Sequence, residues 1–211
     1  RYALSDDLAV FANLGIVNKV PIFDAAINDR DGSVYEDPEL EKFRSFELGG
    51  EMHFGRQLTV KSNLYYTQWK DRTNTRGVVN EDGSEGYIFL TGMNSVHSGF
   101  ETEVAYQPSK LVRADMALSV GNWKYTDDVS GRYTNFAEDG TRQEQSFDYY
   151  IKDLKVGDAP QTQLALGVSL FPVEGLRSQL VYKFFGNHYS DWNPFSRTDA
   201  EDRTQSWQLP N

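Results

Sequence analysis

The feature that most constrains this chain is a strict alternation of tight turns and long loops between amphipathic strand patterns. One hairpin shows the pattern clearly. Apolar and charged residues alternate from Phe100 to Gln107, the chain turns at Pro108–Lys110, and the alternation resumes from Val112 to Gly121. Residues two apart lie on the same face of a strand. Each arm is close to the roughly 9–11 residues of a tilted membrane-crossing strand and longer than the usual soluble strand of about 5–6.

Further segments alternate in the same way, and we expect each of them to be a strand. They are Leu8–Val17, Arg44–Phe54, Leu58–Trp69, Thr162–Leu170 and Leu176–Phe184, with the start of another at Trp207–Leu209. Tight turns are expected at Gly55–Gln57 and Pro172–Gly175. Long polar stretches without periodicity are expected to be loops; they are Asn18–Lys42, Lys70–Val96 with an apolar island at Tyr87–Leu90, Thr126–Pro160 and Asn187–Gln205.

An up-and-down sheet places alternate connections at opposite ends, so all tight turns should lie at one end and all long loops at the other. Outer-membrane barrels have this asymmetry. Aromatic residues sit near both strand ends, and we interpret them as interfacial girdles; the alternative is a soluble core. They are Phe54, Phe171, Tyr65, Tyr66, Trp69, Trp123, Tyr125, Phe184, Phe185 and Tyr189. We therefore predict an all-β fold of antiparallel up-and-down hairpins that forms part of a transmembrane β-barrel, with about seven to eight strands and no closure.

Composition narrows the class of partner. The 211 residues carry a formal charge of −10, which argues against nucleic acid because phosphate binding needs a basic face. The chain has no cysteine, so neither a disulfide framework nor a thiolate metal site can form within it. No apolar run approaches the roughly 18 residues of a membrane helix, but a barrel gives only a weak signal per strand.

Three stretches resemble the C-terminal barrel strands of TonB-dependent receptors. They are Ser45–Thr73, with its paired ELG and YY..W motifs, His97–Pro108, with GFETEVAYQP, and Lys155–Tyr189. The resemblance implies a 22-stranded barrel around an N-terminal plug, in the outer membrane of a Gram-negative bacterium. Such a receptor imports a scarce siderophore, vitamin, oligosaccharide or peptide with energy supplied through TonB.

On this interpretation residues 1–211 form a single partial barrel domain, and the chain is a fragment that lacks the plug and the closing strands. Its expected partners are the imported ligand, outer-membrane lipid, and TonB through the missing N-terminal part, with a surface lipoprotein as an open option. In the Ser98–Tyr125 hairpin we expect Val104, Met116 and Leu118 to face lipid, and Glu101, Glu103, Arg113 and Asp115 to face the lumen.

Ligand contacts should come from aromatic and acidic residues of the long loops, because rings stack on sugars or flat chelates and carboxylates accept hydrogen bonds. We select Tyr87, Tyr189, Asp191 and Trp192. Trp69 and Trp123 are further candidates, but a role as lipid-belt anchors is favoured for both.

No metal or cofactor site is expected. The acidic run Asn28–Ser33 resembles a calcium loop, but the EF-hand register would place Ile27 and Pro38 where carboxylates are needed, so a solvated loop is the default. The histidines have no ligand spacing; they are His53, His97 and His188.

No catalytic residue is expected either. Glu101 and Glu103, with Glu47 and Glu51 on a neighbouring strand, could be viewed as paired glycosidase carboxylates, yet in a barrel this face is the wetted lumen. The chain is therefore interpreted as a transporter and not an enzyme. A soluble secreted β-sandwich that binds carbohydrate remains the alternative.

Overall fold

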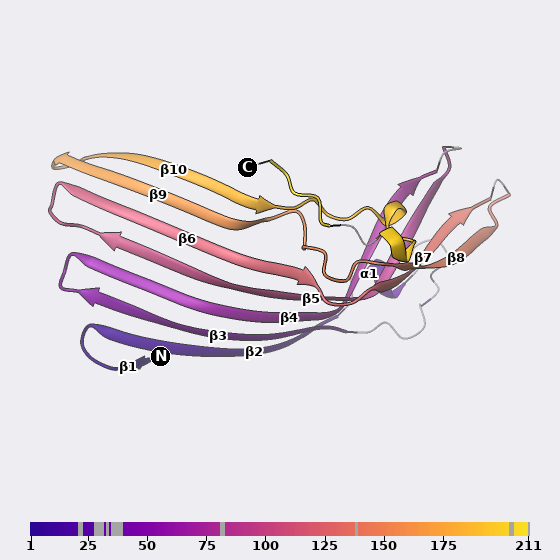
Figure 1. Cartoon of the computed structure of the whole chain (residues 1–211), viewed down its shortest axis with the longest axis horizontal. Coiled ribbons are helices and arrows are strands. Elements are labelled where there is room, and N and C mark those ends of the chain that lie inside the picture. Colours follow the sequence, from indigo (N-terminus) through magenta and orange to yellow (C-terminus); the bar gives the residue numbers. More distant parts are fainter. Residues whose placement is uncertain are drawn as a thin grey trace.

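The computed structural model describes residues 1–20, 23–27, 32, 34, 40–80, 83–137, 139–202 and 205–210. Within them the chain forms one antiparallel sheet of ten strands (Figure 1). The strands are β1 (Tyr2–Ala3), β2 (Leu8–Lys19), β3 (Glu41–Phe54), β4 (Leu58–Val79), β5 (Glu85–Tyr106), β6 (Val112–Tyr125), β7 (Val129–Phe136), β8 (Arg142–Tyr149), β9 (Pro160–Val173) and β10 (Leu176–His188). Short helical turns are α1 (Phe23–Ala26), η1 (Pro194–Ser196) and η2 (Ala200–Asp202). No helix in the described part of the chain is long and apolar enough to cross a membrane.

The strand order follows the chain, β1-β2-β3-β4-β5-β6-β9-β10, with β7 and β8 attached beside β5. The tight turns between β1 and β2, β3 and β4, β5 and β6, and β9 and β10 gather at one end of the sheet, as Figure 1 shows, whereas the short β4–β5 and β7–β8 connections lie at the other end. The first residues belong to this pattern too, because Tyr2 pairs with Val10 and the Asp7 carbonyl accepts a hydrogen bond from the His53 amide at 2.8 Å. The predicted all-β, up-and-down, unclosed architecture is confirmed.

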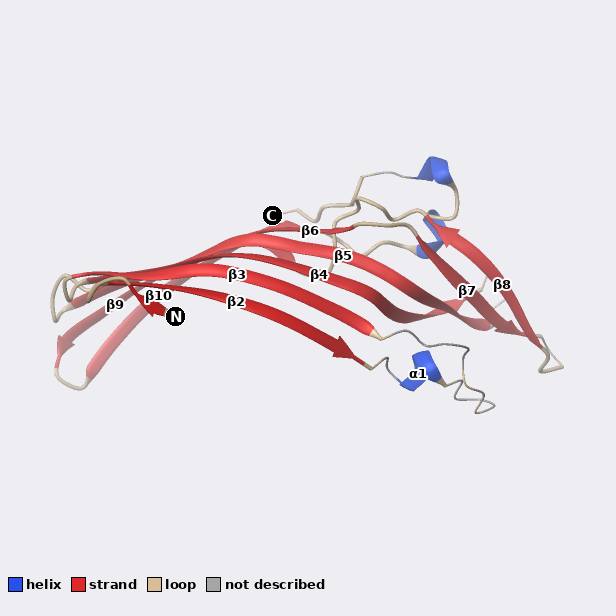
Figure 2. Cartoon of the chain, turned by 90° about the horizontal axis from the view of Figure 1, so that it is seen from below, coloured by secondary structure: helices blue, strands red, loops and turns tan. Residues whose placement is uncertain are grey.

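The two faces of the sheet differ in chemistry. Register puts Val104, Met116 and Leu166 side by side on one face, and Glu103 and Ala117 on the other. The sheet is strongly curved (Figure 2), and two hollows, of about 560 and 360 Å³, lie over the face that carries Glu101 and Glu103, so the polar face is the concave, inner one.

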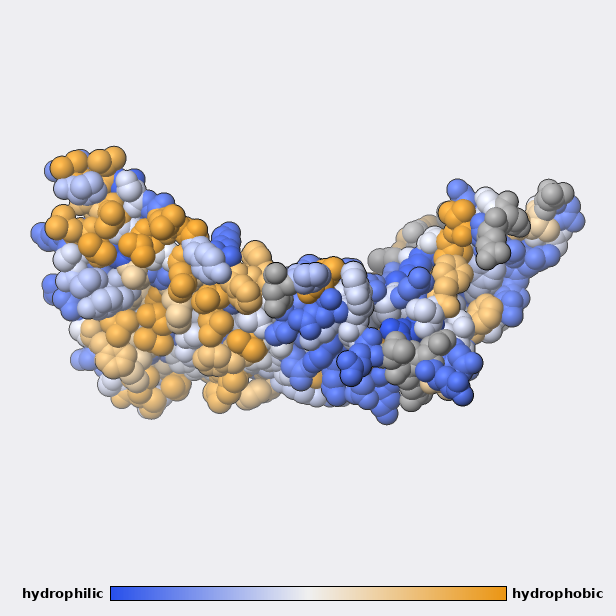
Figure 3. Space-filling view, turned by 45° about the horizontal axis from the view of Figure 1, so that its top comes forward, coloured by the Kyte–Doolittle hydropathy of each residue, from blue (hydrophilic) through white to orange (hydrophobic). Residues whose placement is uncertain are grey.

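The outer face is apolar and uncovered. Leu14 is 84% exposed, Leu64 56% and Leu180 77%. Figure 3 shows the apolar residues gathered over the half of the molecule that carries the tight turns, and mostly hydrophilic residues over the other half. A soluble sandwich would cover such a face with a second sheet, but the described residues form a single sheet. The sandwich alternative is therefore wrong.

The expected loop Lys70–Val96 is wrong. β4 continues to Val79 and β5 begins at Glu85, so only 80–84 connect them. Periodicity fails in the sequence because facing bulges interrupt the ladder near Asp71 (φ 57°) and Gly92 (φ 75°). A bulge adds one residue and so reverses the parity of inward-facing positions.

The expected loop Thr126–Pro160 is also wrong in part, since it contains the β7–β8 hairpin. β7 pairs with the extension of β5, with Leu90 opposite Gly131. Together the two hairpins project beyond the end of the other strands (Figure 1). The hydrophobic core of the described residues lies here, around Leu90, Met93 and Ile151, whereas the strands below it form a single layer.

Two other expectations concern the ends of long connections. The described residues of Asn187–Gln205 form a loop, as expected, apart from the last residues of β10 and the two 3₁₀ turns. Trp207–Leu209 begins to pair with the end of β10 through Tyr189 and Gln208. The acidic run Asn28–Ser33 lies outside the described residues except for Gly32.

Candidate functional site

The loops at the end opposite the tight turns enclose a pocket of about 160 Å³. Its walls come from 154–155, 190–197 and 206–207, and its lining includes Asp191, Trp192, Lys155, Arg197 and Trp207. Two of the four selected residues, Asp191 and Trp192, therefore line one cavity. The volume is below the roughly 300–1,000 Å³ of a complete ligand site, so the pocket could hold only part of a ligand.

Arg76 fixes the segment that carries these two residues. Its Nη1 donates to the Trp192 carbonyl at 2.7 Å, its Nη2 pairs with the Asp191 carboxylate, and its guanidinium carbon lies 4.7 Å from the centre of the Trp192 ring. Trp192 is 5% exposed and also packs on Tyr149, with ring centres 5.7 Å apart. Asp191 and Trp192 thus join the last long loop to the extension of β4.

The buried tyrosines around this contact are held neutral. Burial, reinforced by the negative charge of Asp191, raises the pKa of Tyr125, and burial raises the pKa of Tyr149. Neither phenol is therefore a candidate acid or base near neutral pH.

The other two selected residues lie elsewhere. The Tyr189 ring is 6.0 Å from the Lys155 ammonium, so it borders the pocket through that side chain. Tyr87 is opposite Thr134 on β7, one position from Ile88, which belongs to the core. Successive strand residues face opposite sides, so Tyr87 lies on the outer side of the extension and does not share a site with Trp192.

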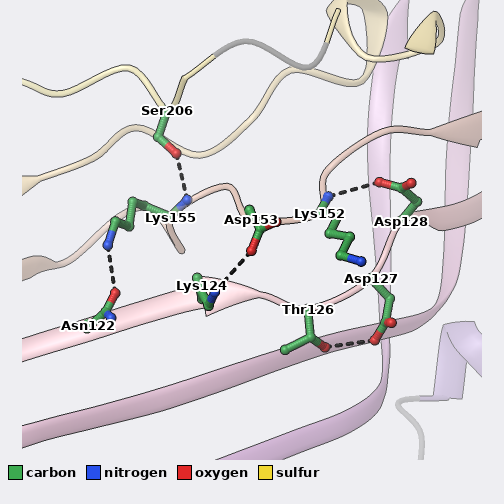
Figure 4. A network of polar contacts seen from close by, with 9 residues as sticks. All are labelled: Asn122, Lys124, Thr126, Asp127, Asp128, Lys152, Asp153, Lys155 and Ser206. Carbon is green, nitrogen blue, oxygen red and sulfur yellow. Dashed lines mark hydrogen bonds and ion pairs between the residues drawn. The ribbon is translucent and has the colours of Figure 1, made fainter.

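A polar network attaches the 150–158 segment to the end of β6 (Figure 4). The Lys155 ammonium donates to Asn122 Oδ1 at 2.6 Å, and its backbone amide donates to Ser206 Oγ at 2.6 Å. Lys124 pairs with Asp153 at 3.0 Å, and the Lys152 amide donates to an Asp128 oxygen at 2.9 Å; Thr126 donates to Asp127 in the same network. This network fixes one wall of the pocket to the barrel.

Two larger hollows lie on the inner wall of the sheet. One of about 560 Å³ is bordered by charged residues of both signs, including Glu51, Lys61 and Arg113. The other, of about 360 Å³, is bordered by residues of β5, β6, β9 and β10. They are Glu101, Thr102, Glu103, Ala117, Leu118, Ser119, Gln163, Leu164, Ala165, Lys183 and Phe185.

The inner-wall carboxylates form a polar ladder. Glu47 accepts from Asn13 and Asn63 at 2.9 and 3.0 Å, and Glu101 accepts from Asn63 and Ser119 at 3.3 Å each. Glu101, Glu103, Arg113 and Asp115 all lie on this inner face, as predicted. The described residues contain no cluster of three metal-ligating side chains.

Above the ladder, aromatic rings cross the inner wall from β3 to β6. Phe43 and Trp69 are 4.7 Å apart, Trp69 and His97 6.4 Å, and His97 and Trp123 5.4 Å between ring centres. The Trp69 indole donates to Glu41 at 3.1 Å. This set of four residues is named the aromatic row below.

The prediction that Trp69 and Trp123 anchor the chain in lipid is wrong, because both face inward. Tyr65 and Phe185 of the proposed girdle also face inward, whereas Tyr66 and Phe54 face outward. The signal was present in the sequence: Trp69 and Tyr65 share odd numbering with Lys61 and Asn63 of the polar face. Position along a strand gives depth, but only parity gives the face.

Comparison with known proteins identifies the class of barrel. Residues 1–210 match the family described as TonB dependent receptor-like, beta-barrel. The chain belongs to the TonB-dependent receptor family. A search of solved structures finds the P. putida toluene transporter TodX, with a TM-score of 0.42 and 14% identity over 86% of this chain; the chain spans 51% of that structure. No curated protein matches.

Family membership suggests which end of this TonB-dependent receptor barrel corresponds to which side of the outer membrane. Outer-membrane barrels have short periplasmic turns and long extracellular loops. By this general pattern the end with the loop pocket and the projecting hairpins corresponds to the extracellular end and is called so below, and the aromatic row lies on the inner wall next to it.

Proposed function

We propose that this chain is the wall and part of the extracellular entrance of an outer-membrane receptor that imports a scarce nutrient with energy from TonB. The observation that carries the proposal is the inside-out distribution of polarity in a chain that matches the family over nearly its whole length. An uncovered apolar outer face fits lipid, while a hollowed, charged inner face fits a wetted lumen.

The entrance is formed by loops that fold inward. The bulges near Asp71 and Gly92 transfer the inner face from odd to even positions, so Arg76, Ile88 and Leu90 continue the inner surface upward. Asp191 and Trp192 pack on that surface. Ligand arriving from outside would meet this inward-folded cluster before it reaches the lumen.

The placement of this chain in the outer membrane can be tested with single cysteines, since the sequence has none of its own. Glu85→Cys and Asp139→Cys lie on the projecting hairpins and should react with a membrane-impermeant maleimide on intact cells. Arg56→Cys, Ser109→Cys and Glu174→Cys lie in the tight turns and should react only after the outer membrane is opened. Equal labelling of both sets on intact cells would refute the topology.

Import is tested genetically. Deletion of this receptor and deletion of TonB should abolish accumulation of the same nutrient, because the family couples transport to TonB. The point substitution Arg56→Ala, in an exposed turn, serves as the control that leaves uptake intact. Uptake that needs the receptor but continues without TonB would contradict the proposal.

A further inference from the structure

The aromatic row continues into the 360 Å³ groove of the inner wall. His97 pairs with Trp123 across β5 and β6; the next inward pair is Gly99 with Gly121, and the next is Glu101 with Ser119. Each step is about 7 Å along the strands. Glu101 and Ser119 lie at the edge of the groove. Along β5 and β6 the aromatic rings are therefore followed by the two glycines and then by the groove.

The two glycines allow rings to lie flat against the wall. A Cβ on Gly99 would be 2.5 Å from the Tyr65 hydroxyl, and a Cβ on Gly121 would be 2.7 Å from Trp123 Nε1. The two polar tips meet above this gap, with the Trp123 indole donating to the Tyr65 hydroxyl at 2.8 Å. Rings that lie along a wall present their faces, and not their edges, to the lumen. The His97 ring adjoins Trp123, with ring centres 5.4 Å apart and planes at 32°, and Tyr65, His97 and Trp123 are named the stacking platform.

The charges at the ends of the platform select its ligand. At one end, the Arg72 guanidinium lies 4.6 Å from the centre of the Trp69 ring, and this cation opposes the approach of a second one. At the other end stand Glu101 and Glu103, with Lys183 across the groove, in a chain with net charge −10. These carboxylates oppose an anionic chelate. Charges of both signs thus border the platform, and a neutral ligand with flat apolar faces and many hydroxyl groups is repelled by neither.

We propose that the platform of Tyr65, His97 and Trp123 and the adjoining groove bind a neutral oligosaccharide. A sugar ring would stack by its C–H face on the platform. The hydroxyls of the next ring would donate to Glu101 and exchange hydrogen bonds with Ser119 and Gln163. Within the described part of the chain, Glu101 accepts two long hydrogen bonds of 3.3 Å, which leaves acceptor capacity on its carboxylate. The 360 Å³ of the groove is within the range of small-ligand sites. The inference rests on the proposed function and names the cargo class for this part of the wall.

The test is calorimetric titration of the intact detergent-purified receptor that contains this chain. The probes are maltoheptaose, cellohexaose, xylohexaose and mannohexaose, with an oligogalacturonate and ferric enterobactin as charged comparisons. At least one neutral oligosaccharide should bind, and the charged probes should not. Binding of a charged probe that depends on Trp123, or binding of none of the neutral probes, would overturn the inference.

Variants locate the binding. Trp123→Ala and Tyr65→Ala should each weaken binding by about tenfold through loss of the stacking surface. Tyr66→Ala is the matched control, because Tyr66 is the adjacent residue on the outer face and is 43% exposed there; it should leave affinity unchanged. Should an alanine variant fail to show the heat-modifiable mobility of a folded barrel, Glu101→Gln keeps the shape of the wall and should still weaken binding about tenfold.

Affinity that is indifferent to Trp123→Ala and Glu101→Gln would refute the site. The result is separable from the proposed function. A receptor that labels with the expected topology and imports another cargo through TonB, yet binds no neutral oligosaccharide, would contradict this inference alone.

Discussion

Replacing Arg76 by alanine should release the 190–197 segment from the extracellular hairpins. The guanidinium donates to the Trp192 carbonyl, pairs with Asp191 and stacks on the Trp192 ring. The side chains of Arg76 and Asp191 are 20% and 30% exposed, so solvent screens the pair only in part. A charge-assisted hydrogen bond contributes about 1.5–3 kcal/mol and an exposed cation–π contact about 0.5–1 kcal/mol.

These contributions share one guanidinium and do not add fully, so the expected local loss is about 2–3 kcal/mol, or roughly 30- to 150-fold in the opening equilibrium. Hydrogen exchange of the intact receptor, followed by mass spectrometry, measures it. The reporters are the Tyr150 amide, which donates to the Arg197 carbonyl, and the Ser190 amide, which donates to the Trp207 carbonyl. Both should exchange faster by that factor, while amides in the centre of β3 should not change.

Two further variants make the test specific. Arg76→Lys keeps the charge but loses the planar fork, so it should give an intermediate effect. Arg56→Ala removes an arginine from an exposed tight turn and should leave both reporters unchanged. If Arg76→Ala changes the exchange of both reporters by less than about threefold, under 1 kcal/mol, then the contact does not hold the loop and the reasoning is wrong.

Three other predictions follow from the faces and the core. Met116→Arg places a charge on the lipid-facing side and should cost about 2–4 kcal/mol of folding free energy in lipid. Ala117→Arg, on the inner face, should fold normally. Urea titration in bilayers compares the two variants, and equal losses of folding free energy would contradict the face assignment. Gly99→Ala places a Cβ against the Val120 backbone oxygen and the Tyr65 hydroxyl and should cost about 1–3 kcal/mol of folding free energy. Gly77→Ala is the control, because its Cβ meets open space. Equal yields of heat-modifiable, folded barrel for the two variants would count against the flat-ring geometry. Burial raises the pKa of Tyr125. The neutral phenol therefore contributes stability that is complete below about pH 10, the usual tyrosine pKa, and is lost as pH rises through the higher pKa of the folded state. Over that alkaline range the protease resistance of the extracellular hairpins should fall in the wild type and fall less in Tyr125→Phe.

Much of the barrel portion was accessible from the sequence because its information is local. Alternation at Phe100–Gln107 and Val112–Gly121 predicted both strands and both faces, and the register confirms that Glu103 and Met116 point to opposite sides. The same alternation puts Trp69 and Trp123 on the inner face, because parity, and not position along the strand, determines the face.

The strands of the extracellular part could not be predicted from the sequence, and the reason is physical. Above Trp69, β4 carries mostly polar residues on both faces and β5 carries apolar residues on both faces at Tyr87–Leu90, while bulges shift the parity within a few residues. A period-two search then finds no strand. The β7–β8 hairpin was missed for a similar reason. β8 carries charged residues such as Arg142 and Glu144, and these are typical of a solvated loop, so the sequence does not indicate that β8 pairs with β7.

The sequence by itself determined the order of the long hairpin strands β2–β6, β9 and β10 and the alternation of their two faces, because these depend on neighbours two residues apart and on the lengths of connections. Only the tertiary structure brought Arg76 to Trp192, 116 residues away, and assembled the platform of Tyr65, His97 and Trp123 from three strands. Contacts of that range depend on register and on bulges, which no local pattern encodes.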